Sequence, residues 1–470
     1  MLRPSTLVPH GLGRRMDWTG RRGVRCFVLL LACGGAALML GVHALLAGSG
    51  PSFAAAKSYA AGPDPVSVAI GDLNGDGKLD VATANATPGT LSVLLNGGNA
   101  SFGSKVDYES GSRPVSVAIG DLNADGKADL VTGNMSTLGR FPSQDVAVLF
   151  NRGDGTFADR VEYPIGLGHG ELSVAIGDLN GDGRLDVAVA DDSHSSVSVL
   201  LNSGNGGLQD HVDYAVGFLP LSIAIGDLNG DGKADLATAN TFGSSVSVLL
   251  NTGDGTFRPK VDYATGPNPP DVAIGDLNGD GKVDLATANG NDANTVSVLI
   301  GRGDGSFSAK VDAGVGRGPA SIAIVDLNGD HKPDLATANA GANTVTALSN
   351  RGDGHVQSRT DVRTGSQPRG IAFGDLNGDG RPDLATADGA NTVSVLVNKT
   401  VSCKVPKVTK KALPAAKRAL ARAHCRVGTL RRTSSTIKRG RVVSQAPKPG
   451  TLMPAGGRVN LVVSRGRRRS

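Results

Sequence analysis

Seven short acidic segments hold the residues of this sequence that could do chemistry. The first reads DLNGDGKLD, from Asp72 to Asp80, and all seven place Asp or Asn at positions 1, 3, 5 and 9. Alternate side chains of a tight loop can direct their oxygens to one centre, and Gly77 permits the sharp turn. Calcium takes roughly six to eight hard oxygen ligands, carboxylates and backbone carbonyls among them. The pattern therefore predicts calcium binding.

The predicted ligands are the side chains at positions 1, 3, 5 and 9 and the backbone carbonyl at position 7, for up to seven calcium ions. They are Asp72, Asn74, Asp76, Lys78, Asp80, Asp121, Asn123, Asp125, Lys127, Asp129, Asp178, Asn180, Asp182, Arg184, Asp186, Asp227, Asn229, Asp231, Lys233, Asp235, Asp276, Asn278, Asp280, Lys282, Asp284, Asp326, Asn328, Asp330, Lys332, Asp334, Asp375, Asn377, Asp379, Arg381 and Asp383. Position 12 of the first loop is Thr83 rather than Glu, so the loop is not an EF-hand.

The seven loops are not identical. One such loop could be a solvated turn that Asx side chains cap without metal, but seven copies with Asp at position 9 favour metal. His331 replaces glycine at position 6 of the sixth loop, and Ala124 replaces glycine at position 4 of the second. Because position 6 needs a sharp turn, we expect the sixth loop to bind calcium most weakly.

These loops recur with a repeat unit. They begin 49, 57, 49, 49, 50 and 49 residues apart, and each unit holds four short segments rich in Val, Ile and Leu between Gly, Asn and Asp. Four strands in about 50 residues is the size of a propeller blade. The fold class is therefore all-β, a seven-bladed β-propeller of four-stranded blades. We place a surface insertion of the second unit around residues 135–144.

A propeller must close its ring, since open end blades expose unpaired strand edges. An F-x-x-x-x-x-Y-like segment precedes the inner repeats, as at Phe157–Tyr163, but none comes after the last repeat, which ends near residue 398. The same pattern occurs before the first repeat, at Phe53–Tyr59. Residues 53–60 are thus predicted to supply the outer strand of the seventh blade.

The repeated VAIGDLNGDGxxDLATAN…VSVLLNxGDGTF resembles FG-GAP/VCBS-type repeats, such as those of integrin α-subunit heads and many bacterial surface proteins. The resemblance covers residues 53–398. It implies a seven-bladed propeller with calcium in the loop between the first two strands of a blade. It also implies adhesion or ligand binding more than catalysis.

The N-terminus resembles an export signal. Five arginines between Arg14 and Arg25 precede an apolar run of about 22 residues from Cys26 to Ala47. The run is long enough to span a bilayer, so a cleaved signal peptide and an uncleaved membrane anchor both remain open. Since positive charge stays in the cytoplasm, the rest of the chain is expected outside, at the cell surface or in the cell wall.

Charge divides the rest of the chain. Residues 401–470 carry 19 Lys and Arg and no acid, whereas residues 51–400 have a net charge of −19. The helical spacing of Leu413, Ala416 and Leu420 and three strand-like stretches after it predict a small α+β domain. The segment GRVVSQAPKPGTLMPAGGRVNLVVSRG closely resembles a PASTA domain, which implies binding to peptidoglycan or its fragments.

Two cysteines, Cys403 and Cys425, lie in this basic tail, and an exported tail can close them into a disulfide. Two free thiols are the alternative. The expected organisation is a signal peptide or anchor over residues 1–52, the propeller over 53–399, a PASTA-like domain over 400–466 and a basic tail over 467–470.

The predicted function is that of an exported, calcium-binding surface protein. The propeller would bind a protein or glycan ligand, and the tail would attach to peptidoglycan or an anionic cell-wall polymer. A sugar-binding lectin is the alternative, and a propeller-based hydrolase or lyase is less favoured. The eight histidines are scattered and no Ser/His/Asp or Cys/His constellation is visible, so we predict no enzyme. We expect a monomer with no nucleic-acid partner, and membrane contact only through the N-terminal segment.

Overall fold

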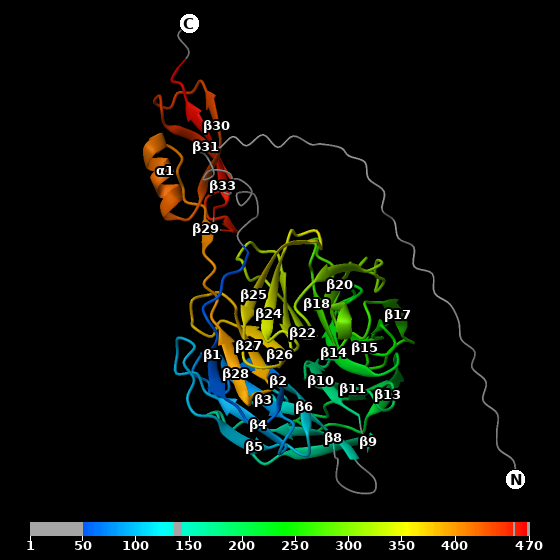
Figure 1. Ribbon diagram of the computed structural model, residues 1–470. Coiled ribbons are helices and arrows are strands. Elements are labelled where there is room, and N and C mark those ends of the chain that lie inside the picture. Colours follow the sequence, from blue (N-terminus) through cyan, green and yellow to red (C-terminus); the bar gives the residue numbers. More distant parts are fainter. Residues whose placement is uncertain (1–49, 136–142, 169, 455, 468–470) are drawn as a thin grey trace, which may run out of the picture. The chain divides into compact units, whose positions relative to one another are not determined.

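Short apolar segments of the repeat form strands throughout the middle of the chain. The computed structural model describes residues 50–135, 143–168, 170–454 and 456–467. These residues form seven four-stranded antiparallel sheets followed by a small C-terminal domain (Figure 1). The predicted export segment lies outside the described residues up to residue 49, as do 136–142 of the predicted insertion and 468–470 of the tail. No helix in the described ranges is long and apolar enough to cross a membrane.

Each sheet consists of four strands. The first strands are β2 (Pro65–Gly71), β6 (Pro114–Gly120), β10 (Leu172–Gly177), β14 (Pro220–Gly226), β18 (Asp271–Gly275), β22 (Pro319–Val325) and β26 (Pro368–Gly374). The second strands are β3 (Asp80–Asn85), β7 (Asp129–Met135), β11 (Asp186–Asp191), β15 (Asp235–Asn240), β19 (Asp284–Asn289), β23 (Asp334–Asn339) and β27 (Asp383–Asp388).

The third strands are β4 (Thr90–Leu94), β8 (Ser143–Leu149), β12 (Ser196–Leu200), β16 (Ser245–Leu249), β20 (Thr295–Leu299), β24 (Thr344–Asn350) and β28 (Thr392–Leu396). The fourth strands are β5 (Val106–Glu109), β9 (Val161–Leu167), β13 (Val212–Ala215), β17 (Val261–Ala264), β21 (Val311–Gly314), β25 (Val356–Arg363) and β1 (Lys57–Ala60). One short 3-10 helix, η2 (Asn291–Ala293), precedes β20.

The sheets form a closed ring. Each first strand lies against the first strands of both neighbouring sheets, and β2 of the first sheet lies against β26 of the last. The core is divided into seven apolar clusters, each built from two adjacent sheets. In one cluster Leu94 of the first blade packs with Val395 of the seventh. The predicted seven-bladed propeller is confirmed.

The N-terminal strand closes the ring, as the F-x-x-x-x-x-Y pattern predicts. β1 pairs antiparallel with β28, so that Tyr59 lies opposite Val393. Phe53 forms an isolated bridge with Asn398, and the backbone N–H of Lys399 donates to the carbonyl of Ser52 at 2.7 Å. The seventh blade is therefore built from both ends of the propeller sequence.

The C-terminal domain has one helix and five strands. The elements are β29 (Ser402–Lys404), α1 (Leu413–Arg422), β30 (Arg426–Thr433), β31 (Val442–Ala446), β32 (Leu452–Pro454) and β33 (Arg458–Ser464). β30 and β33 are parallel, β31 is antiparallel to β33, and β29 pairs with β32. Ala416 and Leu420 of α1 are buried against this sheet with Val459.

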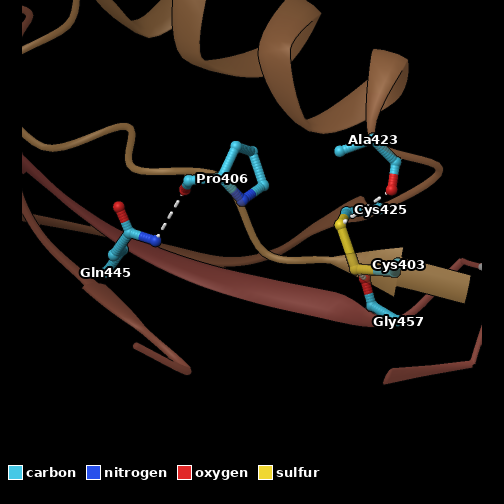
Figure 2. Close-up of a disulfide and its surroundings, with 6 residues drawn as sticks. All are labelled: Cys403, Pro406, Ala423, Cys425, Gln445 and Gly457. Atoms are coloured by element: carbon cyan, nitrogen blue, oxygen red, sulfur yellow. Dashed lines mark hydrogen bonds between the residues drawn. A yellow bond between two sulfur atoms is a disulfide. The ribbon is translucent and has the colours of Figure 1, made fainter. Parts of the chain in front are cut away.

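A disulfide joins Cys403 and Cys425, so the two tail cysteines are paired rather than free (Figure 2). Both cysteines are buried in the core of the C-terminal domain. Nearby, Gln445 Nε2 donates to the carbonyl of Pro406 at 3.0 Å, and the backbone N–H of Val408 donates to Gln445 Oε1 at 2.7 Å. These contacts fasten the segment that enters the domain to its sheet.

Candidate metal-binding loops

Each acidic segment forms the loop between the first and second strands of a blade. In the first loop, Asp72 accepts hydrogen bonds from the backbone N–H groups of Gly75 and Gly77, both at 2.8 Å. Asn74 Oδ1 accepts from the N–H of Asp76 at 3.0 Å. The side chains at positions 1 and 3 therefore turn back into the loop and fix its curvature.

The position-9 aspartate connects the loop to the blade. Asp80 is buried, and its two oxygens accept from the N–H groups of Leu73 at 2.9 Å and Asn96 at 2.7 Å. The equivalent pair of bonds is present in all seven blades. Burial raises the pKa of Asp80, and the negative charges of Asp76 and Asp72 raise it further.

Position 5 has a cationic neighbour. The ammonium of Lys78, at position 7, contacts Asp76 at 2.7 Å and holds the pKa of this exposed carboxyl below its usual value. Arg184 pairs with Asp182 and Arg381 with Asp379 in the same way, both at 2.8 Å. Because the pair is exposed and solvated, it is worth little and can open to admit a metal ion.

The asparagine after the third strand was not predicted from the sequence as part of this region. Asn96 Nδ2 donates to the carbonyl of Leu79 and, across the blade boundary, to the carbonyl of Leu376. Six of the seven blades place an asparagine here, and Gly301 takes its place in the fifth. The sequence feature that could have identified this residue is the asparagine at the end of the VSVLLN-like segments. It ties every such blade to the preceding loop.

The donor set of these loops suits calcium. Within the described ranges, no three His, Cys, Asp or Glu side chains gather at a point that could hold a metal ion. The carboxylates instead accept from backbone N–H groups. In the first loop each oxygen of Asp72 and Asp80 accepts one such bond, which leaves it a second lone pair. Three carboxylates and an amide oxygen in one loop form a hard-oxygen set. Burial is the main cause of the raised pKa of Asp80, and repulsion from Asp76 and Asp72 adds to it; a cation would relieve that repulsion.

The sixth loop differs from the others. Asn328 is only 3% exposed, and its Oδ1 has no hydrogen-bond partner among the described residues. Asp330 is partly buried, and burial raises its pKa, whereas its counterpart Asp76 is exposed. Burial raises the pKa of Asp334 to about 8, against about 6 for Asp129 in the second loop. This loop therefore holds its carboxyl groups in the least solvated setting.

The replaced glycines keep the turn. His331 has a φ of 64°, close to the 78° of Gly77, and its N–H still donates to Asp326 at 2.8 Å. Ala124 in the second loop likewise has a φ of 59°. A side chain in this left-handed region is strained, but the hydrogen bonding of the sixth loop is retained.

Family comparisons match both parts of the chain. The PASTA domain matches residues 404–465. The FG-GAP-like repeat matches six stretches, which are 72–132, 138–189, 178–238, 227–287, 276–337 and 326–386. No curated protein matches the sequence.

Similar solved structures include one described as BBS1N in complex with ARL6DN, at 13% identity and TM-score 0.53, covering 73% of this chain and 96% of that one. A virginiamycin B lyase from Staphylococcus aureus is 15% identical at TM-score 0.50, covering 74% and 99%. A lectin from Agrocybe aegerita that recognises terminal N-acetylglucosamine is 20% identical, covering 69% and 86%, at a TM-score of only 0.46. At these identities the likeness extends to the propeller fold alone.

Proposed function

Because the chain belongs to the FG-GAP-like repeat family and ends in a PASTA domain, we propose that it is an exported, calcium-binding module of the cell surface. In this proposal the propeller binds a protein or glycan ligand, and the C-terminal domain attaches the molecule to the cell wall. No catalytic step is assigned to it. Repeats of this family suggest a non-enzymatic role.

The observation that carries the proposal is the repetition of one oxygen-rich loop in all seven blades, at the same end of every first strand. Six of the loops are tied to the next blade by an asparagine side chain that donates to a leucine carbonyl, as Asn151 does to Leu73. A cation in the loops would therefore stabilise blade boundaries as well as turns. The net charge of −19 over residues 51–400 favours such cations.

The calcium part of the proposal is tested by titrating the metal-free full chain with calcium in a calorimeter. We expect up to seven ions to bind and the melting temperature to rise on binding, since a ligand that binds only the folded state stabilises it. Magnesium is the control ion, because it prefers a smaller octahedral site. Chelation that leaves the melting temperature unchanged would falsify this part.

Cell-wall attachment is supported by the charge of the C-terminal domain. Lys417, Arg418 and Arg422 lie exposed on one side of α1, while Ala416 and Leu420 face the core. Such a basic surface attracts polyanions. We expect the full chain to sediment with a cell-wall fraction and the triple variant Lys417→Glu, Arg418→Glu, Arg422→Glu to remain in the supernatant. Equal sedimentation of the two proteins would contradict attachment through this surface.

A lectin is the second candidate, favoured by one exposed aromatic pair. Phe218 and Phe242 are 61% and 65% exposed, and their ring centroids lie 6.0 Å apart at an interplanar angle of 30°. They lie in the connections before β14 and after β15 of the fourth blade, at the end opposite the acidic loops. Flat apolar rings can stack on sugar faces. Phe218→Ala and Phe242→Ala should each remove the signal on a glycan array. Phe373→Ala is the control and should retain it, because Phe373 is exposed near the end of β26, beside the seventh acidic loop.

A further inference from the structure

The seven repeats provide an alignment within one chain, and it exposes one unusual residue. Each first strand places one residue opposite the same position of its second strand, as Ser67 lies opposite Ala84. The equivalent residues around the ring are Ser67, Ser116, Ser173, Ser222, Asp271, Ser321 and Gly370. All seven line one open cavity of about 520 Å³, which the first strands surround. We call it the central cavity.

Two of these seven positions are not serine. At Gly370 an added Cβ would come within 3.1 Å of the Cα of Ser67, so the close approach of the seventh blade to the first explains the glycine. No such constraint explains Asp271, where the neighbouring blades carry the shorter serine. A charged side chain replacing a neutral one inside a ring is a costly change that points to a task.

Four donors hold the Asp271 carboxylate. Oδ1 accepts from the hydroxyl of Ser222 at 2.6 Å and from the backbone N–H of Val272 at 2.9 Å. Oδ2 accepts from the hydroxyl of Ser321 at 2.7 Å and from the N–H of Ile322 at 2.8 Å. Burial raises the pKa of Asp271, but these four bonds oppose the rise. A proton on the carboxyl would have to displace one of them, so they favour the charged form.

The orientation of the two serine hydroxyls follows from this arrangement. Ser222 and Ser321 donate their only hydroxyl protons to Asp271, and each oxygen has two lone pairs. One pair of Ser321 accepts from the N–H of Ile371 at 3.3 Å, and one pair of Ser222 accepts from the N–H of Val272 at 3.4 Å. The remaining lone pairs stand beside a negative charge at the wall of the cavity. This wall is therefore suited to a cation that donates hydrogen bonds.

The mouth of the cavity carries both charges. Arg369 pairs with Asp64 at 2.6 Å. Arg113 and Glu171 are exposed and have no ion-pair partner among the residues that the structure describes. Glu171 stands where the other repeats place proline. The lining as a whole holds three carboxylates and two guanidinium groups, so it has an excess of negative charge.

We propose that the central cavity is a binding site for a small organic cation with a primary ammonium group. The ammonium donates to Ser222 and Ser321 beside Asp271, and the rest of the molecule extends toward the mouth. A bare metal ion fits this wall poorly, because the Asp271 oxygens already accept four hydrogen bonds and the neighbouring side-chain oxygens are neutral hydroxyls. A simple amine and an amino acid share this ammonium group, and a carboxylate at the other end would meet Arg113.

Calorimetry of the full chain in calcium-containing buffer tests the proposal. The probes are 1,4-diaminobutane and glycine, with acetate and sodium chloride as controls. We expect diaminobutane to bind and Asp271→Ser to weaken its binding roughly tenfold or more, since the negative charge beside the ammonium is lost. Asp271→Ser restores the residue of five other blades, so the fold should survive. Asp254→Ser should leave binding unchanged, because Asp254 is an exposed residue of the turn between β16 and β17, at the end of the blade that carries the acidic loop.

A second variant and the control measurements test the proposal further. Arg113→Gln should weaken the binding of glycine, whose carboxylate would meet the guanidinium, and leave the binding of diaminobutane unchanged. Binding of diaminobutane but not of glycine would identify simple amines as the ligand class. The proposal is overturned if neither amine binds the unmodified chain, if Asp271→Ser binds them equally well, or if sodium chloride gives the same heat. Unchanged circular dichroism and melting temperature of Asp271→Ser separate loss of binding from loss of fold. Failure of this test leaves the calcium titration unaffected.

Discussion

The first and sixth acidic loops share a motif but differ in their surroundings. Asp72 accepts from the N–H of Gly75 at 2.8 Å, and Asp326 accepts from the equivalent N–H at 2.7 Å. Asn74 Oδ1 has a partner in the N–H of Asp76, whereas Asn328 Oδ1 is buried without one among the described residues. The Lys78 ammonium lowers the pKa of Asp76, while burial raises that of its counterpart in the sixth loop.

The segment that comes after the neighbouring third strand also differs between the two loops. Asn151 reaches the carbonyl of Leu73 beside the first loop, and the chain then turns within the second blade. Asn398 reaches the carbonyl of Leu327 beside the sixth loop, and the chain then meets Ser52 from the N-terminal side. Equal motifs thus lie in unequal electrostatic surroundings, because the carboxyl groups of the sixth loop are more buried than those of the first.

The largest expected effect concerns pH. In calcium-free buffer, the folded chain keeps a proton on Asp334 up to about pH 8, whereas the unfolded chain releases it near 3.8. The free energy of unfolding should therefore fall, by on the order of several kcal/mol, as pH rises between these values. In Asp334→Asn the free energy of unfolding should no longer fall above about pH 6. It should still fall below pH 6, because the pKa values of Asp129 and Asp383 are about 6.

Urea unfolding in chelator across this pH range measures the effect. Asp80→Asn is the matched control from the first loop, and it should leave the upper part of the profile intact. An unchanged slope above about pH 6 in Asp334→Asn would mean that the sixth loop is solvated like the first.

A smaller effect concerns calcium itself. From His331 we predicted that the sixth loop binds calcium most weakly. The Oδ1 atom of Asn328, which has no hydrogen-bond partner among the described residues, and the poorly solvated carboxyl groups favour tighter calcium binding by this loop instead. Asp326→Ala should remove more of the calcium-induced stabilisation than Asp72→Ala, by about 1 to 3 kcal/mol. Melting temperatures with calcium and with chelator give the comparison. A larger loss in Asp72→Ala would support the argument from His331.

The smallest effect isolates backbone strain. His331→Gly should stabilise the calcium-free chain by about 1 kcal/mol, because glycine adopts a positive φ without steric cost. Gly77→His in the first loop should destabilise it by a similar amount. Urea unfolding in chelator avoids any contribution of metal. If His331→Gly destabilises the protein, contacts of the imidazole outweigh the strain.

Sequence reasoning reached the fold because its signals are local and repeated. The spacing of Asp72, Asp121 and later loops sets the blade size, and the displaced Phe53–Tyr59 pattern reveals how the ring closes. The position-9 aspartates were assigned as ligands, but their bonds to backbone N–H groups, as from Leu73 and Asn96 to Asp80, were not predicted.

Other features needed the folded ring. Asn328 has the same sequence context as Asn74, so its burial could not be predicted from the motif. Asp271 is visible in the sequence as a change from serine, but its meaning depends on Ser222 and Ser321, which lie about 50 residues away on either side. Side chains so distant in sequence become neighbours only when adjacent blades are in register.

The closure by β1 also determines how the ring would respond to tension. The N-terminal end of β1 lies beside the C-terminal end of β28, because the two strands are antiparallel. Opposite pulls on Ser52 and Thr400 would load the bonds of Lys399 and Ala54 first, and then the strand pairs one after another, as in opening a zipper. The other six blades would bear no load, so under tension between the two ends of the propeller the seventh blade would separate first.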